Sequence, residues 1–361
     1  MSSWLANARP DVLPPSNDVI AMKRLIICCD GTWNTPDQKD GDAAAPSNVA
    51  KFVRALRSRD HAGAPQIVFY SRGVGTRPGI DKWTGGAFGH GLAANVQDAY
   101  RFIVNNYEEG DELSLFGFSR GAYTARSVVG YIRNSGLLRR QFRHMHGHAY
   151  ELYRSRKVHP DDDEARAFRS KYSIEPRIRL LGVWDTVGAL GIPIRSLNWI
   201  TRHRYQFHDV RLSRIVDNAC HAVAIDEQRR QFKPALWEIA DAADAERVQQ
   251  VWFAGVHCNV GGGYADAGLS DLALQWMIEC ADKCGLMFDD TYVREHITPN
   301  ALAELRESRR GLYKLSRRHI RPIGSGTVHP SVIERHAAEL SPRYASDNFV
   351  AWLRAQEGVA G

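Results

Sequence analysis

The segment between residues 111 and 130 constrains the fold of this 361-residue chain more than any other part of it. A short apolar strand is expected over 113–116, followed by Gly117-Phe118-Ser119-Arg120-Gly121 and a helical run over 122–129. Because glycine has no Cβ, Gly117 and Gly121 let strand and helix approach closely around a sharp, strained turn. The pattern is typical of a nucleophile elbow and makes Ser119 the candidate nucleophile. An ordinary glycine-bounded turn is the alternative.

Backbone groups near Ser119 are predicted to hold negative charge. The helix that starts after the turn favours charge at its N-terminus, and the N–H of Arg120 is the expected first oxyanion donor. The second is expected in the loop after the first strand, from the N–H groups of Gly31 and Thr32, while the side chain of Asp30 or Thr32 hydrogen-bonds the site. A simple Asp-Gly turn is the alternative for this loop.

Short apolar runs alternate with amphipathic helices along the chain. Strands are predicted over 25–29, 67–70, 113–116, 178–183 and 251–256, and helices over 95–107, 122–132 and 271–284. This alternation predicts an α/β fold with a mostly parallel, doubly wound sheet that helices cover on both faces. Ligands of such sheets bind at the carboxyl ends of the strands.

We expect one domain over 23–340, preceded by a Pro-containing N-terminal arm over 1–22 and followed by a tail or helix over 341–361. The polar stretch of about 138–177 is too long for a plain loop and is expected to be a helical insertion over the sheet, which helps to build the substrate pocket. We find neither a signal-peptide pattern nor a run of about 20 apolar residues, so we expect a cytoplasmic protein.

A serine nucleophile needs a base and an acid, which in this fold follow it in the order acid, then histidine, each just past a strand. Asp185 and His257 fit that order, and His257 precedes three glycines whose backbone can approach a ligand closely. Structural roles are the alternatives for both residues. Rival acids are Asp226, Asp266 and Asp271.

The other histidines fit this role less well. His221 lies in a stretch, 220–226, that we interpret as an amphipathic helix with a buried, hydrogen-bonded histidine. His144, His146 and His148 lack an acid at ligand spacing, so we expect a solvated segment and no metal site. The proposed chemistry requires no cofactor.

The distribution of charge indicates which partners to expect, and the cysteine pattern indicates the redox compartment. The formal net charge is +6, but the basic residues are dispersed, apart from a cluster over 306–321, so no nucleic-acid partner is expected. A solvated helix face explains that cluster best, and a patch for a membrane surface or an anionic substrate is the alternative. The six cysteines form neither a disulfide nor a zinc pattern, which indicates a reduced compartment.

Several blocks together resemble the family called domain of unknown function 2235: residues 30–34, 47–49, 117–122, 183–188, 221–234, 255–264 and 329–332. The resemblance implies an α/β-hydrolase core. It extends to the catalytic domain of the phospholipase effectors of bacterial type VI secretion, and implies Ser119 as nucleophile, Asp185 as acid and His257 as base. Asn259 stands where relatives often carry Asp.

We therefore expect a serine hydrolase of a carboxylic ester, with a small-molecule or lipid ester, such as a phospholipid, as substrate. Hydrolysis of an amide or polyester, and a non-catalytic partner in a toxin system that retains the fold, stay open as alternatives. Export by a secretion system is the alternative to a cytoplasmic location.

Overall fold

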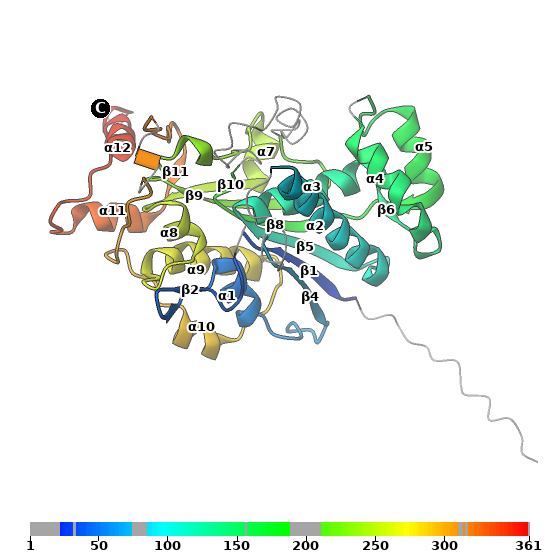
Figure 1. Ribbon diagram of the computed structural model, residues 1–361, viewed down its shortest axis with the longest axis horizontal. Helices are drawn as coiled ribbons and strands as arrows, with labels where there is room; N and C mark the ends of the chain where they lie inside the picture. Colours follow the sequence, from blue (N-terminus) through cyan, green and yellow to red (C-terminus); the bar gives the residue numbers. More distant parts are fainter. Residues whose placement is uncertain are drawn as a thin grey trace, which may run out of the picture.

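A seven-stranded sheet forms the centre of the molecule (Figure 1). The structure, a computed structural model, describes residues 22–31, 34–73, 85–155, 157–187, 211–309, 313–314 and 317–359. The predicted N-terminal arm, apart from its last residue, lies outside the described residues. So do Thr32 and the segment 188–210.

The strand order of the sheet is β11-β10-β9-β8-β5-β1-β4, and every pairing in it is parallel. The strands are β1 (Arg24–Cys29), β4 (Gln66–Ser71), β5 (Glu112–Phe118), β8 (Ile178–Trp184), β9 (Val216–Ala224), β10 (Val248–Phe253) and β11 (Thr327–Val328). The chain goes from β1 to β4 on one side and then to β5 on the other. The strand order therefore reverses at β1. Parallel sheets commonly bind their ligands at such a switch point, beside the carboxyl ends of the strands.

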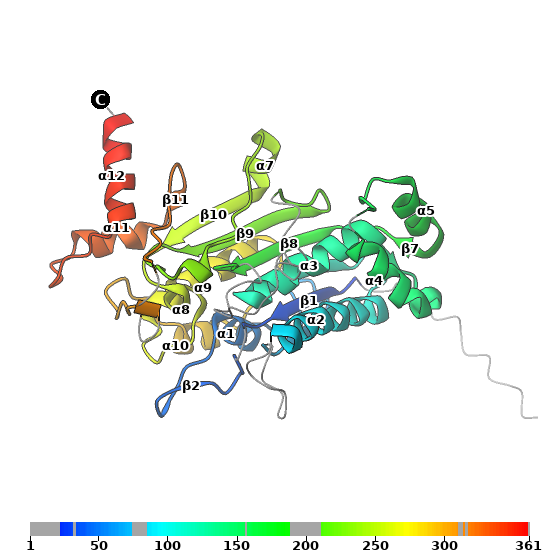
Figure 2. The same cartoon turned by 45° about the horizontal axis from the view of Figure 1, so that its top comes forward.

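Alternating side chains of β1 supply both layers of the core. Leu25, Ile27 and Cys29 pack with α2 (Gly85–Asn106) and α3 (Arg120–Ser135), whereas Ile26 and Cys28 pack with α1 (Asn48–Ala55) and α9 (Gly268–Lys283). Side chains point to opposite faces along a strand, so a run that is apolar throughout must be covered on both sides. Figures 1 and 2 show these helices on the two faces of the sheet. The prediction of an α/β fold with a doubly wound sheet is confirmed.

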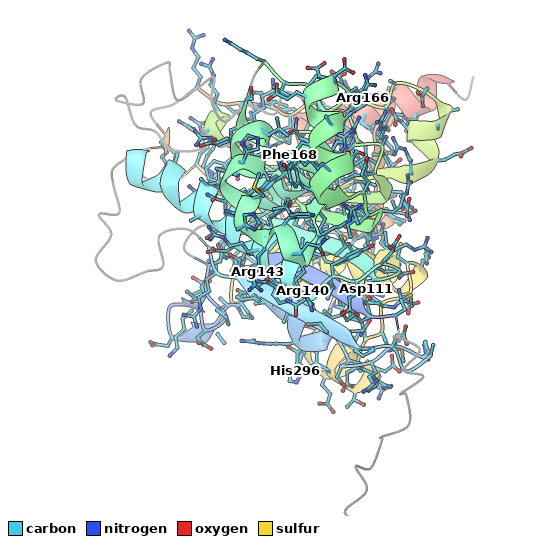
Figure 3. All side chains as sticks on the ribbon, turned by 90° about the vertical axis from the view of Figure 1, so that its right-hand side faces the viewer. Asp111, Arg140, Arg143, Arg166, Phe168 and His296 are labelled. Atoms are coloured by element: carbon cyan, nitrogen blue, oxygen red, sulfur yellow. The ribbon has the colours of Figure 1, made fainter. Side chains whose placement is uncertain are left out.

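The stretch after α3 is helical, as predicted, but it lies at the far end of the sheet from Ser119. It contains β6 (Leu137–Leu138), η1 (Arg140–Met145), α4 (His146–Arg154), α5 (Asp163–Tyr172) and β7 (Ser173–Ile174). Because α3 runs back from the carboxyl end of β5, and β7 leads into the start of β8, the insertion packs at the amino ends of the strands. Figure 3 looks onto this end, with Arg140, Arg143, Arg166 and Phe168 labelled. The expectation that it lies over the sheet is wrong.

Residues 220–226 were predicted to form a helix, but most of them belong to β9. This strand pairs with β8 on one edge and β10 on the other, and residues 219–224 are all buried, so both of its faces are covered there. A strand of this kind is apolar without alternation, and its pattern can be read equally well as a helix. His221 is fully buried and accepts a hydrogen bond from the N–H of Thr186, as its predicted burial requires.

The C-terminal residues form a helix, α12 (Asp347–Val359), next to α11 (Pro330–Ala337), at the β11 edge of the sheet (Figure 2). Phe349 is completely buried in a third apolar cluster with Val223 and Trp252. The remaining elements are β2 (Lys39–Asp40), β3 (Ala43–Ala44), η2 (Arg230–Phe232), α7 (Ala242–Arg247), α8 (His257–Gly261) and α10 (Asp290–His296). None of the helices in the described part of the chain has the length and apolar character that crossing a bilayer requires.

Candidate active site

Ser119 occupies the turn between β5 and α3 in a strained backbone conformation. Its φ is 59° and its ψ is −119°, a region that L-residues rarely adopt. A Cβ on Gly121 would lie 2.0 Å from the carbonyl oxygen of Cys29, and one on Gly117 would lie 2.5 Å from the Gly121 backbone. Only glycine fits at either position, so the sequence enforces the predicted elbow.

The side chains of Ser119, His257 and Asp185 form one hydrogen-bonded chain. The Ser119 Oγ lies 2.8 Å from the Nε2 of His257, and the Nδ1 of His257 lies 2.6 Å from the Oδ2 of Asp185. They come from three strand ends: the elbow after β5, the turn after β8, and the start of α8 after β10. All three are at most 5% exposed. The structure thus brings together residues that lie 66 or more positions apart, in the geometry of a nucleophile, a base and an orienting acid.

Asp185 is held by more than the histidine. Arg321, which is as fully buried as Asp185, donates from Nη1 to its Oδ1 (2.6 Å) and from Nη2 to its Oδ2 (3.1 Å). The N–H of Ala224 also donates to Oδ1. Burial by itself would raise the pKa of Asp185, but the charge of Arg321 and the hydrogen bonds from His257 and Arg321 outweigh it, so its pKa lies well below the usual range. The carboxylate therefore stays ionised.

Two aromatic rings and a second carboxylate are close neighbours of His257. The ring centroids of Phe118 and Phe232 are 4.6 and 4.9 Å from that of the imidazole. The backbone N–H of His257 donates to Glu227, whose carboxylate also accepts from Arg229. Burial lowers the pKa of His257, and the hydrogen bond to Asp185 offsets this only in part. The imidazole is therefore neutral at pH 7, as a general base must be.

Three hydrogen bonds hold the carboxylate of Asp30, which lies in the loop after β1. Asp30 accepts hydrogen bonds from the N–H of Gly31 (2.7 Å), the Oγ of Ser47 (2.6 Å) and the hydroxyl of Tyr70 (2.5 Å). Burial raises the pKa of Asp30 despite these hydrogen bonds. In this conformation the Gly31 N–H donates to Asp30, and its role as an oxyanion donor stays a prediction. The same expectation for Thr32 falls outside the described residues.

Arg120 is the first residue of α3, which begins two residues before the predicted helix. The first N–H groups of a helix have no acceptor within the helix, and they point toward its N-terminus, where Ser119 lies. Partial burial of its side chain lowers the pKa of Arg120 to about 10.

The rival acids have other partners. Asp226 accepts from the N–H of Gly255 (2.6 Å) and the hydroxyl of Tyr344 (3.0 Å), and Asp271 pairs with Lys51 at 2.6 Å. Asp266 accepts from the backbone of Gly268 and Glu304. Among the described side chains, no group of three or more His, Cys, Asp or Glu residues is placed to hold a metal ion.

The contact of Arg321 with Asp185 was not predicted, because the basic cluster of 306–321 was interpreted as a solvated helix face. The described residues of that segment form no long helix, and Arg321 is its one fully buried member. Arg306 pairs with Asp40 at 2.8 Å, and Arg318 pairs with Asp347 at 3.2 Å. No local signal distinguishes Arg321 from its neighbours in the sequence.

Asn259, the departure from the expected Asp, supports the turn that leads into α8. Its Oδ1 accepts from the N–H groups of Val256 and Arg306, and its Nδ2 donates to the carbonyl of Glu304. The amide thus both accepts and donates, which a carboxylate cannot do.

Comparisons with known proteins identify a family. Residues 23–280 match the family described as "T6SS, Phospholipase effector Tle1-like, catalytic domain". An uncharacterized protein of Saccharomyces cerevisiae, YEL023C, is 28% identical over 243 residues, which are 61% of this chain and 33% of that protein.

Three solved structures are similar to parts of this chain. An uncharacterized protein from Pseudomonas aeruginosa is 17% identical with a TM-score of 0.48, covering 77% of this chain and 49% of that one. The Tle1 effector bound to the VgrG spike of the type VI secretion system is 18% identical with a TM-score of 0.43 (69% and 52%). Thermogutta terrifontis esterase 2, phosphorylated by paraoxon, is 14% identical with a TM-score of 0.38 (81% and 88%).

The chain spans about a third of the yeast relative and about half of the first two solved structures. The family match covers well over half of this chain and agrees with the resemblance found in the sequence. The chain belongs to the family of Tle1-like catalytic domains of type VI secretion phospholipase effectors.

Proposed function

We propose that the chain is a serine hydrolase that cleaves carboxylic esters through an acyl-enzyme. The observation that supports this most strongly is the continuous chain from the Ser119 Oγ through both nitrogens of His257 to Asp185. The strained elbow adds to it, since strain of this kind persists where a fold needs one backbone conformation.

In the proposed reaction Ser119 attacks the ester carbonyl while the Nε2 of His257 takes its proton. Asp185 fixes the tautomer with the proton on Nδ1 and stabilises the imidazolium that forms. The N–H of Arg120 donates to the oxyanion, with the backbone of Gly31 and Thr32 as the second predicted source of donors. His257 then protonates the leaving alcohol, and a water that His257 activates releases the acid.

For the substrate we propose an acyl ester of a lipid, with phospholipid as the class to test first. The family description supports this class, because it names phospholipase effectors. Action inside the cell or after export through a secretion system, and contact with a membrane surface through basic residues, remain predictions.

The test is a series of esters of increasing acyl length, including phospholipids, assayed with wild type and Ser119→Ala. The proposal expects turnover by wild type and a loss of several orders of magnitude in Ser119→Ala, with an unchanged melting temperature. Equal rates in the two proteins would contradict the role of Ser119. Turnover of short esters without any of phospholipids would contradict the substrate class alone.

A further inference from the structure

Arg321 connects the acid of the candidate triad with the segment that packs on its histidine. Its guanidinium donates to both oxygens of Asp185 and to the backbone carbonyls of Ala224 and Phe232. The ring of Phe232 in turn lies 4.9 Å from the imidazole of His257, centroid to centroid. The side chain of Arg321 is 0% exposed, so protein groups and not water determine where its charge lies.

The backbone of Arg321 is held from the other side by α12. Asn348 on this helix donates from its Nδ2 to the carbonyls of Ile225 (2.9 Å) and Arg321 (3.0 Å). Ile225 directly follows β9, so this amide ties the segment that carries Arg321 to the end of a central strand. The guanidinium therefore has a fixed position relative to Asp185.

Each of the two carboxylates next to His257 has an arginine of its own. Asp185, which contacts the Nδ1 of His257, is paired with Arg321 at 2.6 Å. Glu227, which accepts from the backbone N–H of His257, is paired with Arg229 at 2.8 Å. Both carboxylates are 0% exposed. The imidazole is thus in contact with two buried ion pairs, each of which is neutral as a whole.

Two further titratable side chains next to this cluster are neutral at pH 7. Burial lowers the pKa of His221, which accepts from the backbone after Asp185, to about 3, and it raises the pKa of Cys258 to about 11. Arg120, at the start of α3, is cationic, but its charge is the same in every variant below. The balance of charge at His257 is therefore determined by the two ion pairs.

A buried carboxylate needs a cation close by, and in a site without Arg321 the nearest group able to become one is the imidazole. With Arg321 in place, protonation of His257 adds a positive charge to a pair that is already neutral, and burial opposes that charge. The imidazole is then not required as a counter-ion. Its Nε2, 2.8 Å from the Oγ of Ser119, keeps the lone pair that a general base needs.

We propose that Arg321 is a positioning residue for the reaction: it balances the charge of Asp185 and so keeps His257 uncharged and able to take the proton of Ser119. This inference rests on the proposed function, in which His257 is the base. Without the charge of Arg321, the Asp185–His257 pair retains one proton to a higher pH. On the imidazole this proton leaves Nε2 without a lone pair. On the carboxyl group it prevents Asp185 from stabilising the imidazolium.

The test is an NMR titration of the His257 imidazole in the full chain, on a Ser119→Ala background and with the signals assigned by comparison with His257→Gln. Arg321→Met removes the charge and the donors. Arg321→Gln removes the charge but keeps an N–H donor for Asp185, so it tests the proposal even if Arg321→Met fails to fold. Arg321→Lys keeps the charge. Arg335→Gln is the matched control, because Arg335 is also buried but donates to backbone carbonyls instead.

The proposal expects a midpoint below 6.5 in the parent protein and a rise of about one pH unit or more in Arg321→Met and Arg321→Gln. It expects Arg321→Lys to restore most of the parent value and Arg335→Gln to leave it unchanged. In protein that retains Ser119, the acid limb of kcat/KM should move upward together with the imidazole midpoint.

An unchanged or lower midpoint in folded Arg321→Gln would overturn the proposal. An equal rise in Arg321→Lys would overturn it as well, because the charge would then not be the cause, and so would an equal rise in Arg335→Gln. The imidazole titration needs no substrate. A failed ester assay and a failed titration are therefore distinguishable results.

Discussion

Replacing Arg321 by methionine should destabilise the protein far more than the loss of an ordinary arginine. Arg321 and Asp185 are both completely buried and share two hydrogen bonds. Methionine leaves the carboxylate charged and without its cation in a dry site, a change that costs about 3–5 kcal/mol. The carbonyls of Ala224 and Phe232 also lose the donors that Arg321 supplies.

The pH dependence of that loss has a definite sign. In wild type the folded pKa of Asp185 is below its unfolded value, so its stabilisation is present above about pH 4 and disappears as the pH falls through the folded pKa. Without Arg321, burial dominates and raises the folded pKa above the unfolded value. Ionisation then opposes folding, so the stability difference between wild type and variant should widen from pH 4 to pH 7.

Urea unfolding of both proteins at several pH values, followed by circular dichroism, measures this difference. Arg318→Gln is the matched control: Arg318 is only three residues away, its side chain is 46% exposed, and its pair with Asp347 should contribute less than about 1 kcal/mol. A loss in Arg321→Met no larger than in the control, or one that is constant with pH, would refute the argument. In Asp185→Asn protein the added loss from Arg321→Met should be much smaller.

Three further outcomes are expected. The acid limb of kcat/KM should have its midpoint below the ordinary histidine value of 6.5, because burial lowers the pKa of His257; a stopped-flow or steady-state pH profile with a midpoint above 6.5 would contradict this. Gly121→Ala should lower the free energy of unfolding in denaturant by about 1–3 kcal/mol and reduce turnover, because its Cβ would clash with the backbone of Cys29. Gly147→Ala is the control: a Cβ there has open space and should leave stability unchanged, so equal effects of the two variants would be inconsistent with the elbow. Asn259→Leu should lower the free energy of unfolding by about 2 kcal/mol through three lost hydrogen bonds, and an unchanged melting curve would argue against that support.

Most of the fold was predictable because its signals are local. The runs at 25–29, 67–70, 113–116, 178–183 and 251–256 all correspond to strands of the sheet, although the last is shifted by several residues. Strand β9 was misread because it is buried on both faces. Strand β11 was not predicted, because two residues carry no period. The place of the insertion follows from the order of the elements, because a helix between two parallel strands has to return to their amino ends, and the sequence analysis did not use this constraint.

The candidate site was predictable where chain order and strand ends determine it. Ser119, Asp185 and His257 each follow a strand, and parallel strands bring their carboxyl ends to one edge. Arg321 was not predictable, because its contact with Asp185 spans 136 residues and arises from the packing of an irregular segment. The hydrogen bond from the Gly31 N–H to Asp30 was not predictable either, because it depends on the side-chain geometry of Asp30.

Activation of the Ser119 hydroxyl by His257 can be measured through its reaction with a fluorophosphonate. Mass spectrometry of the labelled protein identifies the modified residue, with His257→Gln and Ser119→Ala treated in the same way. We expect one adduct, on the peptide that contains Ser119, formed far more slowly in folded His257→Gln and absent in Ser119→Ala. An adduct on another residue, or the same rate of labelling without the imidazole, would contradict it.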